Sequence, residues 1–265
     1  MMRDISFGQY YPAESVIHRL DPRTKLLCAL AFIVIIFFAD SLFSYLLALA
    51  GCIAVALLAR IPFVRLVKSL KPLIFIAVFT AVFNVFGMKG ETLLTPDGFF
   101  IKIYLEGVIN ACYMIIRLIA LVLGTLIMIS YTTTPIALTH GIESLLYPLS
   151  KIGVPVHEFA MMMSIALRFI PTIMEETDKI VSAQKARGAD FESGGLIKRA
   201  KAFIPIMVPL FVSAFRRADE LATAMECRCY GAEKKRTRMN ELHFAARDYG
   251  FMVACAAYCA AIVML

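Results

Sequence analysis

Two arginines, Arg187 and Arg228, lie in matching surroundings near the ends of two long helical patterns. Each has a small residue on either side: Ala186 and Gly188 in the first case, Cys227 and Cys229 in the second. Small neighbours leave a guanidinium free to enter a groove and to bind a carboxylate through two parallel hydrogen bonds. One such end means little, because arginine favours the helix C-terminal dipole and glycine ends helices. Two matching ends are a stronger indication that both arginines bind partners.

Other patterns that could perform chemistry favour structural roles. The sequence has no Gly-x4-Gly-Lys-Ser/Thr loop that would hold nucleotide phosphates, and its four histidines lack His-Glu-x-x-His spacing. Cys227 and Cys229 are separated by one residue, which is too close for the usual zinc or redox pair. We therefore expect no catalytic site and no metal site in this chain.

Arg117 is the one charged residue within the apolar run 107–130. An arginine at membrane depth costs about 2.5–3.5 kcal/mol on insertion scales, so it normally faces a partner group or a water-filled cavity. It could bind substrate in a stand-alone secondary transporter or channel. Alternatively, it contacts backbone carbonyls or Asn84 and only packs the helices together.

The composition indicates a membrane protein. Of the 265 residues, 60% are hydrophobic and 18% are charged, and the mean hydropathy is +0.76. Soluble domains average about 45–50% apolar and about 25% charged residues, so a soluble fold would expose large apolar patches. The chain has a net charge of +7, but its basic residues form no run interleaved with aromatic residues. It therefore indicates cytoplasmic loops beside anionic lipid, not nucleic-acid binding.

Five apolar runs predict membrane-spanning helices, and loop charges predict their orientation. The predicted spans are residues 26–39, 42–59, 73–86, 107–130 and 249–265, some of which need flanking residues to reach the roughly 20 residues of a crossing. The N-terminal arm and the loop after the second span are basic, and that loop has no acidic residue. The positive-inside rule therefore places the N-terminus in the cytoplasm and the C-terminus outside.

Two further helical patterns, at about 156–188 and 196–230, lie between the fourth and fifth spans. Each has an apolar middle, but as spans they would move the basic residues between them to the outside, against the positive-inside rule. Both also contain proline, which bends helices. We therefore expect an N-terminal arm with four spans (1–130), a cytoplasmic region of long helices (131–247) and a C-terminal span (248–265).

Four strings carry a resemblance to a known family. They are His-Arg-Leu-Asp-Pro-Arg-Thr-Lys at 18–25, Ala-Leu-Arg-Phe-Ile-Pro at 166–171, Gln-Lys-Ala-Arg-Gly at 184–188 and Met-Glu-Cys-Arg-Cys-Tyr-Gly at 225–231. With the five-span count, they are similar to the transmembrane T component (EcfT) of energy-coupling factor transporters, a CbiQ-like family. The resemblance covers essentially the whole chain.

The resemblance implies an all-α membrane scaffold for ATP-driven vitamin or micronutrient uptake across the plasma membrane of a prokaryote. Its long cytoplasmic helices would cross as an X. The segments around Arg187 and Arg228 would dock onto two ATP-binding-cassette ATPases, which would bind the ATP and magnesium. In the second segment, cysteines stand where the family commonly has alanine or another small residue.

The resemblance also implies a third subunit, a substrate-binding S component, held by the apolar faces of the long helices. The residues expected to contact it are Met207, Leu210 and Phe211. In this family the S component selects the vitamin or metal ion, so the sequence does not name the substrate. The stand-alone transporter or channel that uses Arg117 is the alternative function.

Overall fold

The computed structural model describes residues 10–39, 41–87, 104–189, 191, 195–230 and 243–265. Within these residues the regular elements are all helices, which confirms the predicted all-α class. The chain divides into two compact units. One, the bundle, comprises residues 6–156 and 242–265; the other contains two long helices within 157–241 and is called the helix pair below.

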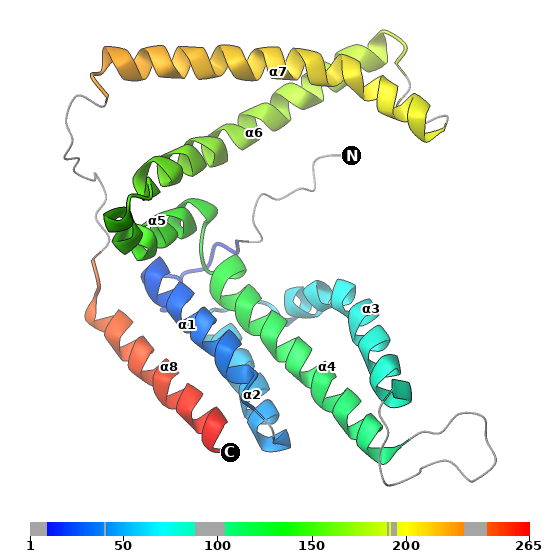
Figure 1. The fold of residues 1–265 in the computed structure, drawn as a ribbon, viewed down its shortest axis with the longest axis vertical. Coiled ribbons are helices and arrows are strands. Elements are labelled where there is room, and N and C mark those ends of the chain that lie inside the picture. Colours follow the sequence, from blue (N-terminus) through cyan, green and yellow to red (C-terminus); the bar gives the residue numbers. More distant parts are fainter. Residues whose placement is uncertain (1–9, 40, 88–103, 190, 192–194, 231–242) are drawn as a thin grey trace. The chain divides into compact units, whose positions relative to one another are not determined.

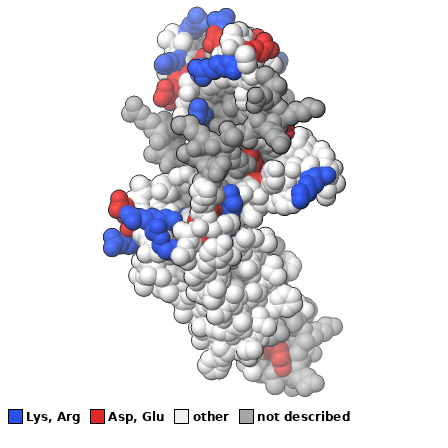
Figure 2. Space-filling view, turned by 90° about the vertical axis from the view of Figure 1, so that its left-hand side faces the viewer, with Lys and Arg blue, Asp and Glu red and all other residues white. Residues whose placement is uncertain are grey.

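The bundle is built from six α-helices (Figure 1): α1 (Pro22–Ile36), α2 (Leu42–Leu58), α3 (Phe63–Gly87), α4 (Leu105–Thr125), α5 (Pro135–Leu146) and α8 (Ala246–Met264). A π-helical segment, Leu126–Tyr131, extends α4, and a 3-10 segment, Tyr147–Ile152, follows α5. Helices α1, α2, α4 and α8 pack around one apolar core. The visible face of the bundle is largely uncharged, and most of its charged side chains gather at one end (Figure 2).

Capping side chains explain where several helices begin. The Asp21 carboxylate accepts the backbone N–H of Arg23 at 2.9 Å, directly ahead of the proline that starts α1. The Thr134 hydroxyl accepts the N–H of Ala137 at 3.3 Å ahead of the proline that starts α5. Thr134 therefore caps α5, and the 3-10 segment after α5 ends at Gly153, whose φ is +90°.

Each of the five predicted spans corresponds to a helix, namely α1, α2, α3, α4 or α8. Among the described residues, four helices are long and apolar enough to cross a membrane: α3, α4 with its extension, α8 and also Val156–Ala186. Helix α2 has 17 residues and α1 has 15, so both need flanking residues to cross. The cytoplasmic location of Val156–Ala186 therefore still depends on the loop charges.

Helix α3 begins earlier than the sequence predicted. The basic segment 63–71, expected as a loop, is helical and leads directly into the predicted span. Pro72 lies inside the helix and cannot donate a hydrogen bond to the preceding turn, so α3 bends there (Figure 1). The following loop, residues 88–103, lies outside the described residues.

The helix pair consists of α6 (Val156–Ala186) and α7 (Leu196–Cys227). They run antiparallel and cross in the view of Figure 1. Glu176 of α6 contacts Ser213 and Arg217 of α7, while Gln184 near the end of α6 contacts Pro205 near the start of α7. Helix α5, which the sequence analysis grouped with the long helices, instead packs on α1 in the bundle.

Candidate functional site

Helix α6 ends in a Schellman motif that fixes the position of Arg187. The Ala189 N–H donates to the Gln184 carbonyl at 3.0 Å, and the Gly188 N–H donates to the Lys185 carbonyl at 3.0 Å. Gly188 has a φ of +87°, the left-handed conformation that glycine adopts without steric cost. Arg187 is therefore the C-cap, the last residue before the chain turns away from the helix axis.

Helix α7 ends in the same motif. The Tyr230 N–H donates to the Met225 carbonyl at 3.0 Å, and the Cys229 N–H donates to the Glu226 carbonyl at 2.9 Å. Cys229 takes the left-handed position, with a φ of +55°. Arg228 is the C-cap of this helix. The chain thus turns at a cysteine, and the helix ends at Cys227, three residues before the end of the helical pattern at about 196–230.

The two arginines are equivalent in structure as well as in sequence, because each is the C-cap residue of its helix. Both are exposed, as are Ala186 and Cys227, which precede them. The Schellman hydrogen bonds already satisfy the carbonyls that each motif reaches, so the guanidiniums are not needed there. Within the described part of the chain, neither Arg187 nor Arg228 pairs with a carboxylate. Each arginine therefore presents its donors outward from the end of a long helix.

A polar contact in the middle of the helix pair holds α6 and α7 together. The Glu176 carboxylate accepts hydrogen bonds from the Ser213 hydroxyl and from Arg217, the latter at 3.1 Å. The Arg217 guanidinium also lies over the ring of Phe169, 5.6 Å from its centroid. The side chains of Glu176 and Arg217 are both about one-third exposed, at 30% and 31%. Because both side chains are partly exposed, the pair joins α6 to α7 but contributes little to stability, on the order of 0–1 kcal/mol.

A second contact follows from the prolines of α7. Pro209 has no N–H, so the carbonyl of Pro205 lacks the donor that a regular helix would supply four residues later. The Gln184 side-chain amide donates to that carbonyl across a long hydrogen bond of 3.5 Å. The proline that bends α7 therefore also supplies a contact point for α6.

The three residues expected to contact an S component lie on two adjacent stripes of α7 that differ in exposure. Met207 and Phe211 are 51% and 55% exposed, on the side of the helix that carries the exposed Ile204 and Phe215. Leu210 is half-buried and lies three residues before Ser213, in the stripe that faces α6. The structure therefore places Met207 and Phe211 on an open apolar surface and Leu210 beside the helix crossing.

Comparison with known proteins places the chain in a family. Residues 13–239 match the family CbiQ, described as cobalt transport protein. The chain belongs to the CbiQ family. Among the described residues, no three His, Cys, Asp or Glu side chains are grouped so that they could hold a metal ion.

Curated relatives within the family share one description, energy-coupling factor transporter transmembrane protein EcfT. The protein from Thermosediminibacter oceani is 50% identical over 96% of this chain and 94% of its own length. The protein from Ruminiclostridium cellulolyticum is 52% identical over 94% of this chain and 92% of its own. The protein from Bacillus subtilis is 46% identical over 96% of this chain and 95% of its own length. The similarity to the energy-coupling factor family expected from the four strings is confirmed.

Arg117 has a structural partner in this CbiQ-family chain. Its guanidinium donates to the Ala39 carbonyl at 3.2 Å and to the Tyr45 hydroxyl, and it lies over the rings of Phe37 and Tyr45. The contact with a backbone carbonyl is the packing role considered above. Asn84, the other partner considered there, donates to the Thr80 carbonyl. Arg117 therefore fastens α4 to the turn between α1 and α2, and the stand-alone transporter loses its main support.

The first of the four strings forms a buried polar cluster, a role that the sequence analysis did not assign. Lys25 is 2% exposed, and its ammonium donates to the carbonyls of Thr132 at 2.7 Å and His18 at 3.3 Å. The Asp248 carboxylate accepts the backbone N–H of Asp21 at 2.8 Å. The cluster therefore joins the start of α1 to the end of the π-helical segment and to the first turn of α8. A lysine followed directly by a long apolar run was the signal that could have indicated it.

Proposed function

We propose that this chain is the coupling scaffold of an energy-coupling factor transporter in a prokaryotic plasma membrane. Its relatives are described as the transmembrane protein of such transporters, at about 50% identity over almost the whole chain. The observation that carries the coupling role is the matching geometry of two helix ends, each with an exposed arginine at the C-cap. The partners are two ATP-binding-cassette ATPases, which bind the ATP and magnesium.

The antiparallel arrangement separates the two docking points. Tyr230, two residues beyond Arg228, donates from its hydroxyl to the sulfur of Met161 near the start of α6. Arg187 lies at the other end of α6, 26 residues further along, or on the order of 40 Å at 1.5 Å per residue. Such a separation suits two ATPases that each bind one arginine. A change in the spacing of the ATPases would then act on both ends of the helix pair.

The open apolar surface of α7 is the proposed contact for the S component. Met207 and Phe211 would contact it directly, with Leu210 at the edge beside α6. Aromatic and methionine side chains adapt their packing, which suits a surface that must hold its partner while it moves. In the membrane topology that the loop charges predict, the N-terminus and the helix pair lie on the cytoplasmic side, where the ATPases have access to them.

Purification of the tagged chain from its own cells tests the proposal. The expected result is recovery of two ATP-binding-cassette subunits and one small apolar substrate-binding protein with the chain. A charged substitution on the open surface, such as Phe211→Asp, should release the small protein and leave the ATPases bound. Release of the ATPases with retention of the small protein would reverse the assignment of the two surfaces. A chain that purifies alone and transports substrate in vesicles would contradict the scaffold role.

A further inference from the structure

Two cavities of the bundle are neighbours at the end of α2, where Leu58 lines both. One is apolar, about 330 Å³, and is bordered by α1, α2, α8 and α4 with its extension. The other is basic and about 530 Å³, and Leu58 borders both. On α8, Phe251 borders the apolar cavity, while Arg247, one turn earlier on the same face, borders the basic cavity. The two neighbouring cavities are together called the recess below, with an apolar part and a basic part.

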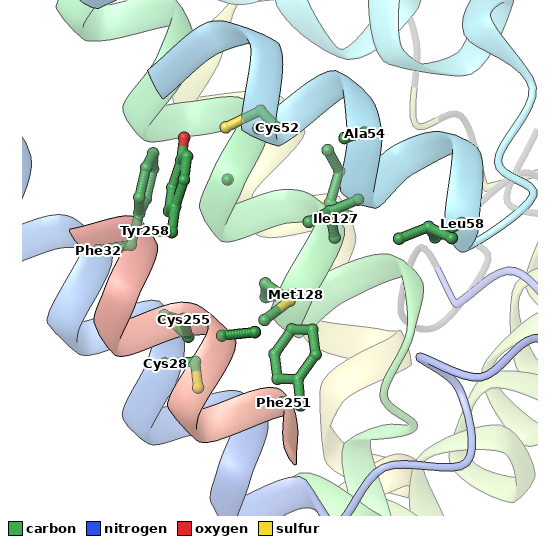
Figure 3. A pocket seen from close by; sticks show the side chains of 15 residues that line it. Cys28, Phe32, Cys52, Ala54, Leu58, Ile127, Met128, Phe251, Cys255 and Tyr258 are labelled. Atoms are coloured by element: carbon green, nitrogen blue, oxygen red, sulfur yellow. The ribbon is translucent and has the colours of Figure 1, made fainter. Parts of the chain in front are cut away.

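The side chains around the apolar cavity leave no free hydrogen-bonding group for a water molecule (Figure 3). The Tyr258 hydroxyl at its far end already donates to the carbonyls of Leu47 and Ala48, at 3.1 Å each. The Cys52 thiol donates to the Ala120 carbonyl at 3.5 Å. The remaining labelled side chains around the space are apolar or thiol groups: Cys28, Phe32, Ala54, Leu58, Ile127, Met128, Phe251 and Cys255. A cavity without free polar partners does not hold ordered water, so in a bilayer its matching occupant is a hydrocarbon chain.

The basic cavity carries more positive than negative side chains. Its lining includes Arg19, Arg60 and Arg247, with Glu14 as its acidic residue. Arg19 and Glu14 lie 3.5 Å apart and form an exposed ion pair. Arg60 and Arg247 have no carboxylate partner within the described part of the chain, so they can bind an anion. Planar guanidiniums bind phosphate oxygens through paired, charge-assisted hydrogen bonds.

Arg60 occupies a backbone position that ordinarily favours glycine. Its φ is +55°, and it is the left-handed residue of the turn that ends α2. The Arg60 N–H donates to the Leu57 carbonyl at 3.0 Å, and the Ile61 N–H donates to the Ala56 carbonyl at 3.1 Å. A side chain in this conformation carries a steric cost, and among the described residues no hydrogen bond or ion pair of the Arg60 side chain offsets it. A strained residue kept at the mouth of a cavity is typical of a binding site.

We propose that the recess binds one anionic phospholipid. Its headgroup phosphate lies between Arg60 and Arg247, and one acyl chain enters the apolar cavity. The basic loops predict that this end of the bundle faces the cytoplasmic leaflet, where arginines near the surface attract anionic headgroups. The lipid fills space between α2 and α8 and so helps to hold the last helix, which packs on α1 and α2. This site is separate from the arginines at the ends of α6 and α7.

Lipid titration of the purified full chain in detergent, read by native mass spectrometry, tests the site. Dioleoyl phosphatidylglycerol should bind in a one-to-one complex at least about tenfold more tightly than dioleoyl phosphatidylcholine. Glycerol 3-phosphate at the same concentration should not displace the lipid, because it lacks the chain. Equal affinity for the two lipids, or displacement by glycerol 3-phosphate, would overturn the proposal.

Substitutions separate the two parts of the recess. The double variant Arg60→Gly/Arg247→Gln should bind phosphatidylglycerol about tenfold more weakly, and Arg60→Gly relieves backbone strain, so the fold should persist. Lys151→Gln, an exposed cation elsewhere in the bundle, is the charge control. Ala254→Phe should fill the apolar cavity and weaken both lipids, whereas Ala257→Phe, on the same helix but lining neither cavity, should not. Unchanged phosphatidylglycerol binding by the double variant would also overturn the proposal.

Discussion

The cysteine in the left-handed position of α7 distinguishes the two arginine motifs. At Cys229, with a φ of +55°, replacement by glycine removes a steric cost of about 1–2 kcal/mol. We expect Cys229→Gly to slow amide hydrogen exchange of Tyr230 about fivefold without loss of the ATPases, since about 1 kcal/mol corresponds to that factor. The reciprocal variant Gly188→Ala should accelerate exchange of Ala189. Unchanged exchange in both variants would contradict the equivalence of the two turns.

His18 makes the stability of the bundle depend on pH. Its Nε2–H donates to the Tyr11 carbonyl at 2.9 Å, and Nδ1 accepts the Ser15 hydroxyl at 2.8 Å. Burial lowers the pKa of His18 below its ordinary 6.5, and the nearby charge of Lys25 acts in the same direction. The fold favours the neutral imidazole, so this stabilisation is complete above pH 6.5 and is lost as the pH falls through the lower pKa of the folded state.

Thermal unfolding in detergent checks this dependence. Between pH 7.5 and pH 5.5, the Tm of the wild-type chain should fall more than the Tm of His18→Gln, which has no titrating group at this position. Parallel curves for the two proteins would show that His18 does not contribute.

Residue types and spacing indicate both arginines as candidates, but they do not predict the turns that present them. The helical pattern at about 196–230 gives no sign of a turn at Cys229, because glycine is the usual left-handed residue at a helix end. A left-handed cysteine, like the left-handed Arg60, follows from tertiary context and not from local preference. The sequence also did not predict the partners of Arg117, because Ala39, in the turn after α1, and Tyr45, in the first turn of α2, are more than 70 residues away.

At the scale of elements, proline sets the shape of the helix pair. Figure 1 shows a bend in the N-terminal half of α7, the part of the helix that contains Pro205 and Pro209. The variant Pro209→Ala would restore the N–H that can donate to the Pro205 carbonyl and would remove the need for Gln184 there. We expect α7 to straighten. Over the 17 residues from the bend to Glu226, a change of about 20° moves the helix end by roughly 5–10 Å.

Spin labels on Glu158 of α6 and Glu226 of α7 can measure this movement in a background without other cysteines. The distance between the labels should shift by that amount in Pro209→Ala, with weaker uptake and the ATPases still bound. Val208→Ala, an exposed neighbour that leaves the backbone hydrogen bonds intact, is the control. An unchanged distance would mean that the prolines do not set the crossing of the helices.

Apolar patterns in the sequence predicted most of the helices, because the hydrophobic periodicity of a helix is a local property. The bent start of α3 was missed, since basic residues ahead of Pro72 were assigned to a loop although they continue a helix. The sequence did not predict the packing of α5 on α1 for a different reason. Hydropathy and loop charges indicate where a helix lies relative to the membrane, but not which helix it contacts.

At the scale of the whole molecule, the open question of topology is whether α6 crosses the membrane or lies on its cytoplasmic side. Its length and composition would allow it to cross a membrane, whereas the basic residues after it favour the cytoplasmic side. A cysteine at the exposed Ser182, with the native cysteines replaced, should react with an impermeant thiol reagent only after the cells are permeabilised. A cysteine at the exposed Leu265 should react in intact cells. Rapid labelling of the first site in intact cells would place the end of α6 outside.

The double substitution Arg187→Ala/Arg228→Ala tests the coupling role most directly. Loss of one buried charge pair costs about 3–5 kcal/mol, yet the second contact keeps the partners at high effective concentration, so either single substitution should leave partial assembly. Lysine cannot reproduce the planar guanidinium, so Arg187→Lys should also weaken assembly. Lys185→Ala, an exposed cation two residues away, is the matched control.

The measurement is co-purification of the ATPases together with substrate uptake, at equal amounts of inserted chain. The double variant should insert and fold, because both arginines are exposed at helix ends, but it should lose the ATPases and abolish uptake. Normal uptake by the double variant would contradict the account.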